Sequence, residues 1–164
     1  MEIYTGKRLS VEQKVFRLPN GTEREKVVIH PGNAAVMLPI DGDTCILLRQ
    51  YRFVIDEYIY EAPAGTLNHG EDPVACARRE LIEEARVDAK TLIPRGFIWT
   101  TPGFTDEKLF LFEARDLTPS EEFPRDEDEI IEVVRVPVRD VKAMVRDGRI
   151  CDAKTISIIA RCLG

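Results

Sequence analysis

Three glutamates lie close together in the stretch 79–84, which reads RELIEE. On a helix, which turns by about 100° per residue, Glu80, Glu83 and Glu84 share an arc of roughly 100°. Like charges this close destabilise a helix by a few tenths of a kcal/mol unless a cation compensates for them. Carboxylate oxygens are also the ligands that Mg²⁺ prefers in proteins. The stretch therefore forms either a solvated helix face or a binding site for a divalent cation.

A helix must position these carboxylates, and the residues before them predict one. Asp72 can cap the helix N-terminus, and Pro73 suits the first helical position. An apolar stripe at spacings of three and four residues gives the helix a face to bury. The stripe consists of Val74, Ala77, Leu81 and Ala85.

The rest of the chain predicts mostly strands, with two more helices at the end. We expect strands over 11–18, 23–30, 34–40, 44–50, 58–62, 93–100, 108–114 and 130–136, and helices over 138–147 and 152–163. The polar stretch 118–129 is expected to form a mobile surface loop. This order predicts an α/β (α+β) fold with a mixed sheet between helical layers. Residues 1–34 would form an N-terminal β-hairpin extension of a domain over 35–164.

Composition excludes several classes of protein. A length of 164 residues fits one domain, and a net charge of −6 argues against a general nucleic-acid binder. The longest apolar run, 34–40, is too short to span a bilayer, and the N-terminal stretch lacks the apolar region of a secretion signal. The four cysteines show no metal-ligand spacing and favour reduced thiols. We therefore expect a cytoplasmic protein with neither nucleic-acid nor membrane partners.

The segment 65–87, GTLNHGEDPVACARRELIEEARV, resembles the Nudix box. The matching residues are Gly65, Glu71, Arg79, Glu80, Leu81, Glu83, Glu84 and Val87. Chance gives the first seven of these matches in on the order of one chain in ten thousand. One position departs, because Arg86 stands where the family has a glycine. A left-handed arginine would cost roughly 1–2 kcal/mol, so we expect a perturbed helix end with the carboxylates upstream intact.

The resemblance implies hydrolysis of a diphosphate that is linked to another moiety, with Mg²⁺, or Mn²⁺, as the cofactor. It assigns metal ligation to Glu80, to Glu84 and to the backbone carbonyl of Ala64. Glu83 would be a further ligand or a catalytic helper, and Arg79 would orient the glutamates. The metal ions would polarise the diphosphate and help deprotonate the attacking water.

Residues outside the box resemble one branch of the family. Pro102 lies 16 residues beyond Arg86, a spacing that marks the ADP-ribose pyrophosphatase branch. The resemblance extends over roughly residues 35–163. It implies a small-molecule substrate of the nucleoside diphosphate-sugar type, namely ADP-ribose, which would be cleaved to AMP and ribose 5-phosphate. An ordinary turn at the end of a strand would also explain Pro102.

Four residues near this segment are candidates for substrate binding. Arg52 matches a family arginine that approaches the phosphates, and Arg49 precedes it on the same predicted strand. Phe104 and Glu107 follow Pro102 and are expected to contact the ribose or the base. Surface salt bridges are the alternative role for the two arginines. His30 and His69 show no partner spacing and are expected to be structural or exposed.

The branch often carries its general base on a loop remote from the box. The acidic loop 121–133, EEFPRDEDEIIEV, has the corresponding place. Alignment on the strand that follows favours Glu127 as the base, with Glu129 second. Either glutamate could instead be an ordinary solvated residue of the loop.

The branch also exchanges its N-terminal strands between two subunits. This implies a homodimer, for which Val15, Phe16 and 27–29 would supply apolar area. A hairpin packed on its own domain is the alternative.

Two other functions compete with ADP-ribose hydrolysis. One is a Nudix hydrolase for another nucleotide sugar or for a dinucleotide. The other is a non-catalytic, Nudix-like ligand sensor, which the presence of Arg79, Glu80, Glu83 and Glu84 argues against.

Overall fold

A computed structural model describes residues 1–124 and 129–164 of the chain. Its elements are β1 (Glu2–Thr5), β2 (Ser10–Arg17), β3 (Glu23–His30), β4 (Ala34–Asp41), β5 (Thr44–Arg52), β6 (Glu57–Glu61), β7 (Ala64–Thr66), α1 (Pro73–Ala85), β8 (Val87–Trp99), β9 (Lys108–Pro119), β10 (Ile131–Pro137), α2 (Val138–Arg146) and α3 (Ala153–Leu163). Within these described ranges, no helix is long and apolar enough to cross a membrane.

The predicted elements are present, with a few differences. The short strands β1 and β7 have no counterpart in the prediction, and β8 begins at Val87 rather than near residue 93. Strand β9 continues to Pro119, so the first residues of the predicted loop 118–129 belong to a strand. The residues that extend β8 and β9 pair with each other, Val87 opposite Pro119 and Asp88 opposite Thr118. Cross-strand pairing therefore extends both strands beyond the predicted ends. The sequence does not indicate these extensions, because their polar and apolar residues do not alternate clearly.

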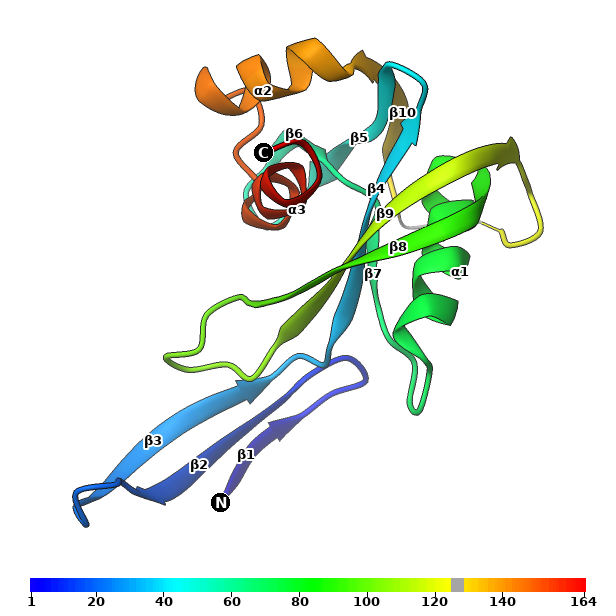
Figure 1. The fold of residues 1–164 in the computed structure, drawn as a ribbon. Helices are drawn as coiled ribbons and strands as arrows, with labels where there is room; N and C mark the ends of the chain where they lie inside the picture. Colours follow the sequence, from blue (N-terminus) through cyan, green and yellow to red (C-terminus); the bar gives the residue numbers. More distant parts are fainter. Residues whose placement is uncertain (125–128) are drawn as a thin grey trace.

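A seven-stranded mixed sheet forms the centre of the molecule (Figure 1). Its main path runs β10-β5-β4-β9-β8, and β6 and β7 pair with β5 and β4. Strands β4 and β9 are parallel, whereas the other pairs are antiparallel. This arrangement lays β7 beside the central strand β4, with Ala64 opposite Val36. The segment that leads into α1 is thereby fixed to the middle of the sheet.

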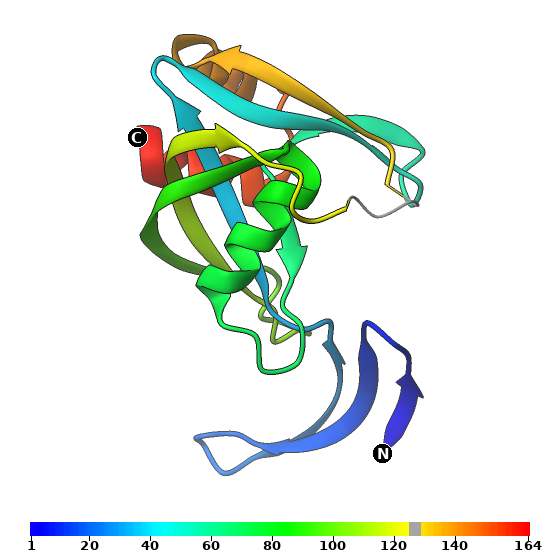
Figure 2. The same ribbon diagram turned by 90° about the vertical axis from the view of Figure 1, so that its right-hand side faces the viewer.

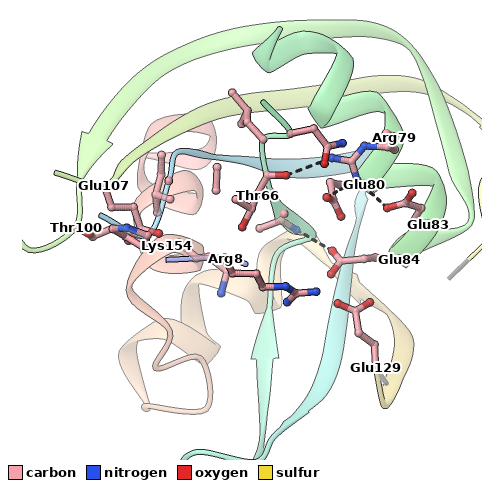
Figure 3. A pocket seen from close by; sticks show the side chains of 18 of the residues that line it. Arg8, Thr66, Arg79, Glu80, Glu83, Glu84, Thr100, Glu107, Glu129 and Lys154 are labelled. Carbon is pink, nitrogen blue, oxygen red and sulfur yellow. Dashed lines mark hydrogen bonds and ion pairs between the residues drawn. The ribbon is translucent and has the colours of Figure 1, made fainter. Parts of the chain in front are cut away.

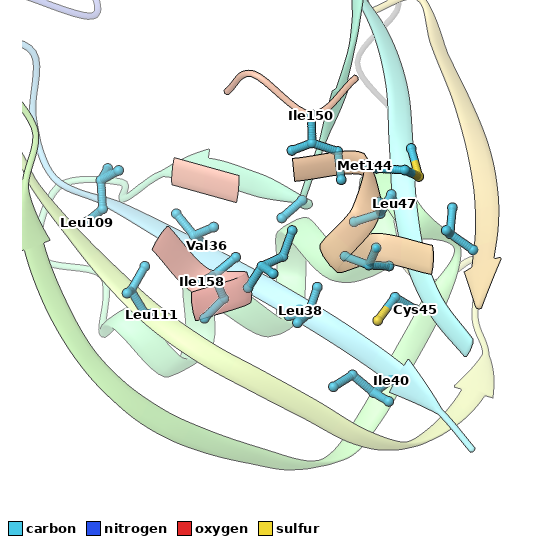
Figure 4. Packing of buried hydrophobic residues seen from close by; sticks show 14 of the residues in the cluster. Val36, Leu38, Ile40, Cys45, Leu47, Leu109, Leu111, Met144, Ile150 and Ile158 are labelled. Atoms are coloured by element: carbon cyan, nitrogen blue, oxygen red, sulfur yellow. The ribbon is translucent and has the colours of Figure 1, made fainter. Parts of the chain in front are cut away.

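Alternate residues of β4 pack on opposite faces of the sheet. Val36, Leu38 and Ile40 belong to one buried cluster, together with residues of α2 and α3 (Figure 4). Ala35 and Met37 belong to a second cluster, together with residues of α1. Each large aliphatic side chain buried in this way contributes about 1.5–3 kcal/mol. The predicted α/β (α+β) fold, with a mixed sheet between helices, is confirmed.

The first three strands form a separate antiparallel sheet that projects from the main sheet (Figures 1 and 2). A backbone hydrogen bond from Ile29 N to Phe104 O, at 2.9 Å, joins it to the loop after β8. His30 adds a side-chain link, since its Nδ1 lies 2.6 Å from Asp106 Oδ2 and its Nε2 lies 3.3 Å from Glu12 Oε1. The hydrogen bond to Asp106 raises the pKa of His30 above its usual value. Histidine 30 thus has a structural role, as expected.

The start of helix α1 follows the sequence prediction. Asp72 is the N-cap, and its Oδ2 accepts hydrogen bonds from Val74 N at 2.9 Å and Ala75 N at 3.3 Å. Pro73 occupies the first turn, where its missing N–H costs nothing. These contacts fix the direction of the helix that carries the glutamates.

The end of α1 differs from the expectation. Arg86 caps the helix in a left-handed conformation, with φ 57° and ψ 32°, and its N–H donates to Ile82 O. The predicted perturbation of the helix end is therefore wrong, because an arginine holds the conformation that a glycine adopts most easily. The Arg86 guanidinium also donates to Phe123 O at 3.1 Å, which offsets part of the strain.

This geometry predicts different stabilities for two substitutions of Arg86. Arg86→Gly and Arg86→Ala both lose the bond to Phe123 O, but only glycine relieves the left-handed strain. The free energy of unfolding of Arg86→Gly should therefore exceed that of Arg86→Ala by about 1 kcal/mol in denaturant titrations. Equal values for the two variants would contradict a strained cap.

Candidate active site

A cavity of about 1020 Å³ lies where the central sheet meets the start of α3 and the N-terminal sheet (Figure 3). One part of its wall comes from β7 and the inner face of α1. Another part comes from the turn between β1 and β2 and from the segment 152–154. Elements far apart in the sequence therefore enclose one space.

Most of the predicted site residues line this cavity. They are Arg52, Ala64, Arg79, Glu80, Glu83, Glu84, Glu107 and Glu129. Glu127 falls outside the described residues. Arg49 and Phe104 are absent from the part of the lining that the structure describes. Arg49 instead stacks over the ring of Tyr58 at 4.3 Å, and Phe104 is exposed.

Arg79 organises the acidic part of the wall. Its Nε and Nη2 each donate to Glu71 at 3.0 Å. Its Nη1 donates to Glu80 Oε1 at 2.6 Å and to Glu83 Oε2 at 3.0 Å. Its Nη2 also reaches Thr66 O at 3.3 Å. One guanidinium thus ties the helix face to the loop before α1.

Glu84 forms the deepest part of the acidic wall. The residue is 3% exposed, and its Oε2 accepts a hydrogen bond from Ala64 N at 2.8 Å. Burial raises the pKa of Glu84 well above its ordinary value, although the bond from Ala64 acts in the opposite direction. The contact also joins the two chain segments from which a carboxylate and the Ala64 carbonyl could reach one cation.

Glu80 packs directly against the backbone of Gly65. A Cβ at position 65 would lie 1.9 Å from Glu80 Cδ, so only glycine leaves room for this carboxylate. Burial raises the pKa of Glu80 to about 7, and the nearby charge of Arg79 offsets only part of that rise. Glu83 and Glu129 contribute further negative charge. A divalent cation would relieve this repulsion.

The donors fit a hard divalent cation, although the carboxylates are not gathered around one point. Among the described residues, no three acidic, histidine or cysteine side chains form a group that could hold a metal ion. Arg79 draws Glu80 and Glu83 toward itself, which accounts for this arrangement. Oxygen donors from Glu80, Glu84 and the Ala64 carbonyl suit Mg²⁺, which accepts few protein ligands and keeps several waters.

The cavity also includes cations that the sequence analysis does not identify. Lys7 and Arg8 lie in the turn between β1 and β2, and Lys154 lies in the first turn of α3. Nothing in the sequence marks the turn residues, because their contact with the cavity depends on how the N-terminal sheet folds back. Lys154 belongs to the segment 151–155, CDAKT, whose juxtaposition with the cavity depends on the packing of α3.

Comparisons with known proteins agree with this geometry. A family model described as NUDIX domain matches residues 30–156. The chain is 38% identical over 156 residues to an ADP-ribose pyrophosphatase of Bacillus subtilis, covering 94% of this chain and 84% of that protein. It is 33% identical over 157 residues to a GDP-mannose pyrophosphatase of Yersinia pestis, covering 88% and 78%. A crystal structure of an ADP compounds hydrolase matches with a TM-score of 0.86 and 25% identity, covering 98% and 88%.

The contact between Gly65 and Glu80 predicts the effect of one methyl group. In Gly65→Ala, the Glu80 carboxyl group must move, but the helix need not, because the clash involves the end of a flexible side chain. We expect affinity for Mn²⁺ to fall about tenfold or more in calorimetric titrations, with the free energy of unfolding changed by less than about 1 kcal/mol.

Gly103→Ala is the matched control, because a Cβ there meets no atom within 4 Å. Its affinity for Mn²⁺ should equal that of the wild type. Unchanged Mn²⁺ affinity in Gly65→Ala would contradict a role of Glu80 in cation binding.

Proposed function

The chain belongs to the NUDIX domain family, and on that premise we propose that it hydrolyses ADP-ribose to AMP and ribose 5-phosphate. It is a Nudix pyrophosphohydrolase. The observation that carries the choice of substrate is the 38% identity to an ADP-ribose pyrophosphatase over 94% of the chain. A cavity with carboxylates on one wall and the cations Arg52 and Lys154 on another is suited to a diphosphate and its counterion.

We propose Mg²⁺ as the cofactor, with Mn²⁺ as a substitute. Glu80, Glu84 and the Ala64 carbonyl would hold the metal, with Glu83 as a further ligand. When bound, the metal supplies charge neutralisation at the phosphates and a more acidic water. The contribution of Arg79 is to hold Glu80 and Glu83 on one face of α1 until a cation competes for them.

Glu129 is our candidate for the general base. It lines the cavity, and its negative charge acts on both Glu80 and Glu84 (Figure 3). A carboxylate in that place can accept the proton of the attacking water. Glu127, which the sequence alignment favours, lies outside the described residues, so the position of Glu129 is the support for this choice.

The relative that acts on GDP-mannose supports one alternative. Its 33% identity over 157 residues is compatible with a nucleotide sugar as the substrate. The same diphosphate chemistry would apply, and only contacts with the base and the sugar would differ. A non-catalytic sensor is disfavoured, because Arg79 retains its bonds to Glu71, Glu80 and Glu83.

We also propose a homodimer formed through the N-terminal sheet. Large apolar side chains of this sheet are exposed, and they include Ile3, Tyr4, Val15, Phe16 and Val27. A second copy of the chain could bury such a surface.

The state of the cysteines bears on the cellular compartment in which the protein works. Cys45, Cys76, Cys151 and Cys162 are all free. Free thiols favour a reducing compartment, which supports the expectation of a cytoplasmic enzyme.

Substrate preference tests the proposed reaction. Across ADP-ribose, GDP-mannose, dinucleotides and deoxynucleoside triphosphates, kcat/KM should be highest for ADP-ribose, by about tenfold or more. Hydrolysis should require Mg²⁺ or Mn²⁺ and stop when EDTA is added, because the carboxylates need a cation to bind phosphate. Phosphate-product profiling measures both effects. If ADP-ribose is not among the best substrates, the proposal is wrong.

Substitution of Glu129 tests its role as the general base. Glu129→Gln should lower kcat about a hundredfold while KM changes little. Glu121→Gln is the control, because Glu121 is an exposed glutamate of the same connection. A hundredfold loss in Glu127→Gln, together with less than about a threefold loss in Glu129→Gln, would instead identify Glu127 as the base.

The molar mass in solution tests the proposed homodimer. Size-exclusion chromatography with light scattering should give about twice the chain mass of 18.6 kDa. Val15→Asp should shift the protein toward the monomer, because the substitution places a charge at an exposed apolar position of the N-terminal sheet. A wild-type monomer would refute the dimer.

A further inference from the structure

A buried carboxylate joins two cations beside the cavity. The Glu61 side chain is 1% exposed, and it accepts from Arg52 Nε at 2.6 Å and from Arg52 Nη2 at 2.7 Å. Its Oε2 also contacts Lys154 Nζ. Burial alone would raise the pKa of Glu61, but the bonds and charges of Arg52 and Lys154 outweigh it and lower the pKa. Glu61 is therefore an anion held between two cations from distant parts of the chain.

The start of α3 is fixed to the same segment. Asp152 caps the helix, and its Oδ2 accepts from Thr155 N at 3.0 Å and from Thr155 Oγ1 at 2.6 Å. Thr155 Oγ1 in turn accepts from Ala62 N at 2.8 Å. The Lys154 ammonium also lies 3.1 Å from Asp152 Oδ2. These contacts fix the position of Lys154 relative to Ala62, two residues before Ala64, whose carbonyl is a proposed metal ligand.

Both cations keep donors for a ligand. The two bonds from Arg52 to Glu61 use Nε and Nη2, and within the described residues Nη1 has no acceptor. Lys154 contacts Glu61 and Asp152, which leaves one of its three protons without an acceptor in the same part of the chain. Both residues line the cavity, and Figure 3 shows Lys154 across it from Glu80 and Glu83.

Arg79 cannot supply this charge to a phosphate. Its donors are directed at Glu71, Glu80, Glu83 and Thr66 O. The diphosphate of ADP-ribose carries two negative charges, and a divalent cation on the acidic wall would share its charge with Glu80 and Glu84 as well. Arg52 and Lys154 also line the cavity, and the buried carboxylate of Glu61 holds both of them in place.

We propose that Lys154 binds the diphosphate of the substrate together with Arg52, and that Glu61 is the positioning residue that aligns the two cations. This inference rests on the proposed function for the presence of a diphosphate in the cavity. It assigns a role to the segment 151–155, which lies outside the motif that carries the carboxylates. The planar guanidinium of Arg52 can donate directed hydrogen bonds to phosphate oxygens, whereas the ammonium of Lys154 supplies a compact positive charge.

The test measures binding of α,β-methylene ADP, whose diphosphate bridge resists hydrolysis, by calorimetry in the presence of Mg²⁺. In Lys154→Met, which keeps the length of the side chain but removes its charge, the dissociation constant should rise about tenfold or more. Binding of adenosine, which has no phosphate, should stay unchanged. With ADP-ribose as the substrate, KM should rise more than kcat falls.

Lys142→Met is the matched control, because Lys142 is exposed on α2, away from the cavity. It should bind α,β-methylene ADP as the wild type does. If Lys154→Met also binds it within about twofold of the wild type, the inference is wrong. If the wild type does not hydrolyse ADP-ribose but loses diphosphate binding in Lys154→Met, the proposed substrate is wrong and the inference stands.

A double-mutant cycle tests the role of Glu61. If Glu61 aligns Lys154, the loss caused by Lys154→Met should be at least about threefold smaller in a Glu61→Gln background. Strictly additive losses would overturn the positioning role. If Glu61→Gln does not fold, Glu61→Asp replaces it, since its shorter side chain retains the charge but reaches Arg52 and Lys154 less well.

Discussion

The charge balance around Arg79 is the constraint on which the rest of the site depends. Burial disfavours the charged forms of Glu80 and Glu84, yet both lie on the face of α1 that lines the cavity. A single guanidinium offsets part of this cost through Glu71, Glu80 and Glu83. The pKa of Glu80 remains raised despite Arg79, and a divalent cation on this face would offset the remaining cost of the charged form.

Two walls of opposite charge meet at residues 61–65, which run from the end of β6 to the start of β7. Glu61 holds Arg52 and Lys154 on one wall, whereas Ala64 N binds Glu84 and Gly65 contacts Glu80 on the other. The sheet holds the segment between them, since Met37 N on β4 donates to the carbonyl of residue 63 at 2.9 Å. The backbone of this segment therefore sets much of the separation between the proposed metal ligands and the two cations that we propose bind the diphosphate.

Local signals predict much of this arrangement. The cap at Asp72, the spacing of Glu80 and Glu84 and the continuous apolar run of β4 act over a few residues, so the sequence reveals them directly. The placement of Lys154 depends on how α3 packs, and that of Arg49 on a stacking contact with Tyr58, so both need tertiary information. The left-handed Arg86 shows the opposite case, in which tertiary contacts override a local preference.

The segment 61–65 has a consequence for how this protein can vary. Glu61 ends β6, which pairs with β5, and Ala64 begins β7, which pairs with β4, so inserting or deleting one residue between them would shift one of these strands against its partner. Related sequences and functional variants from engineered libraries should therefore keep the length of this segment constant, even where the residues around it change. The turn 53–56 has no such restriction, because its apolar side chains are exposed, Phe53 at 82% and Val54 at 81%. Length changes should accumulate in turns of this kind, outside the segment 61–65.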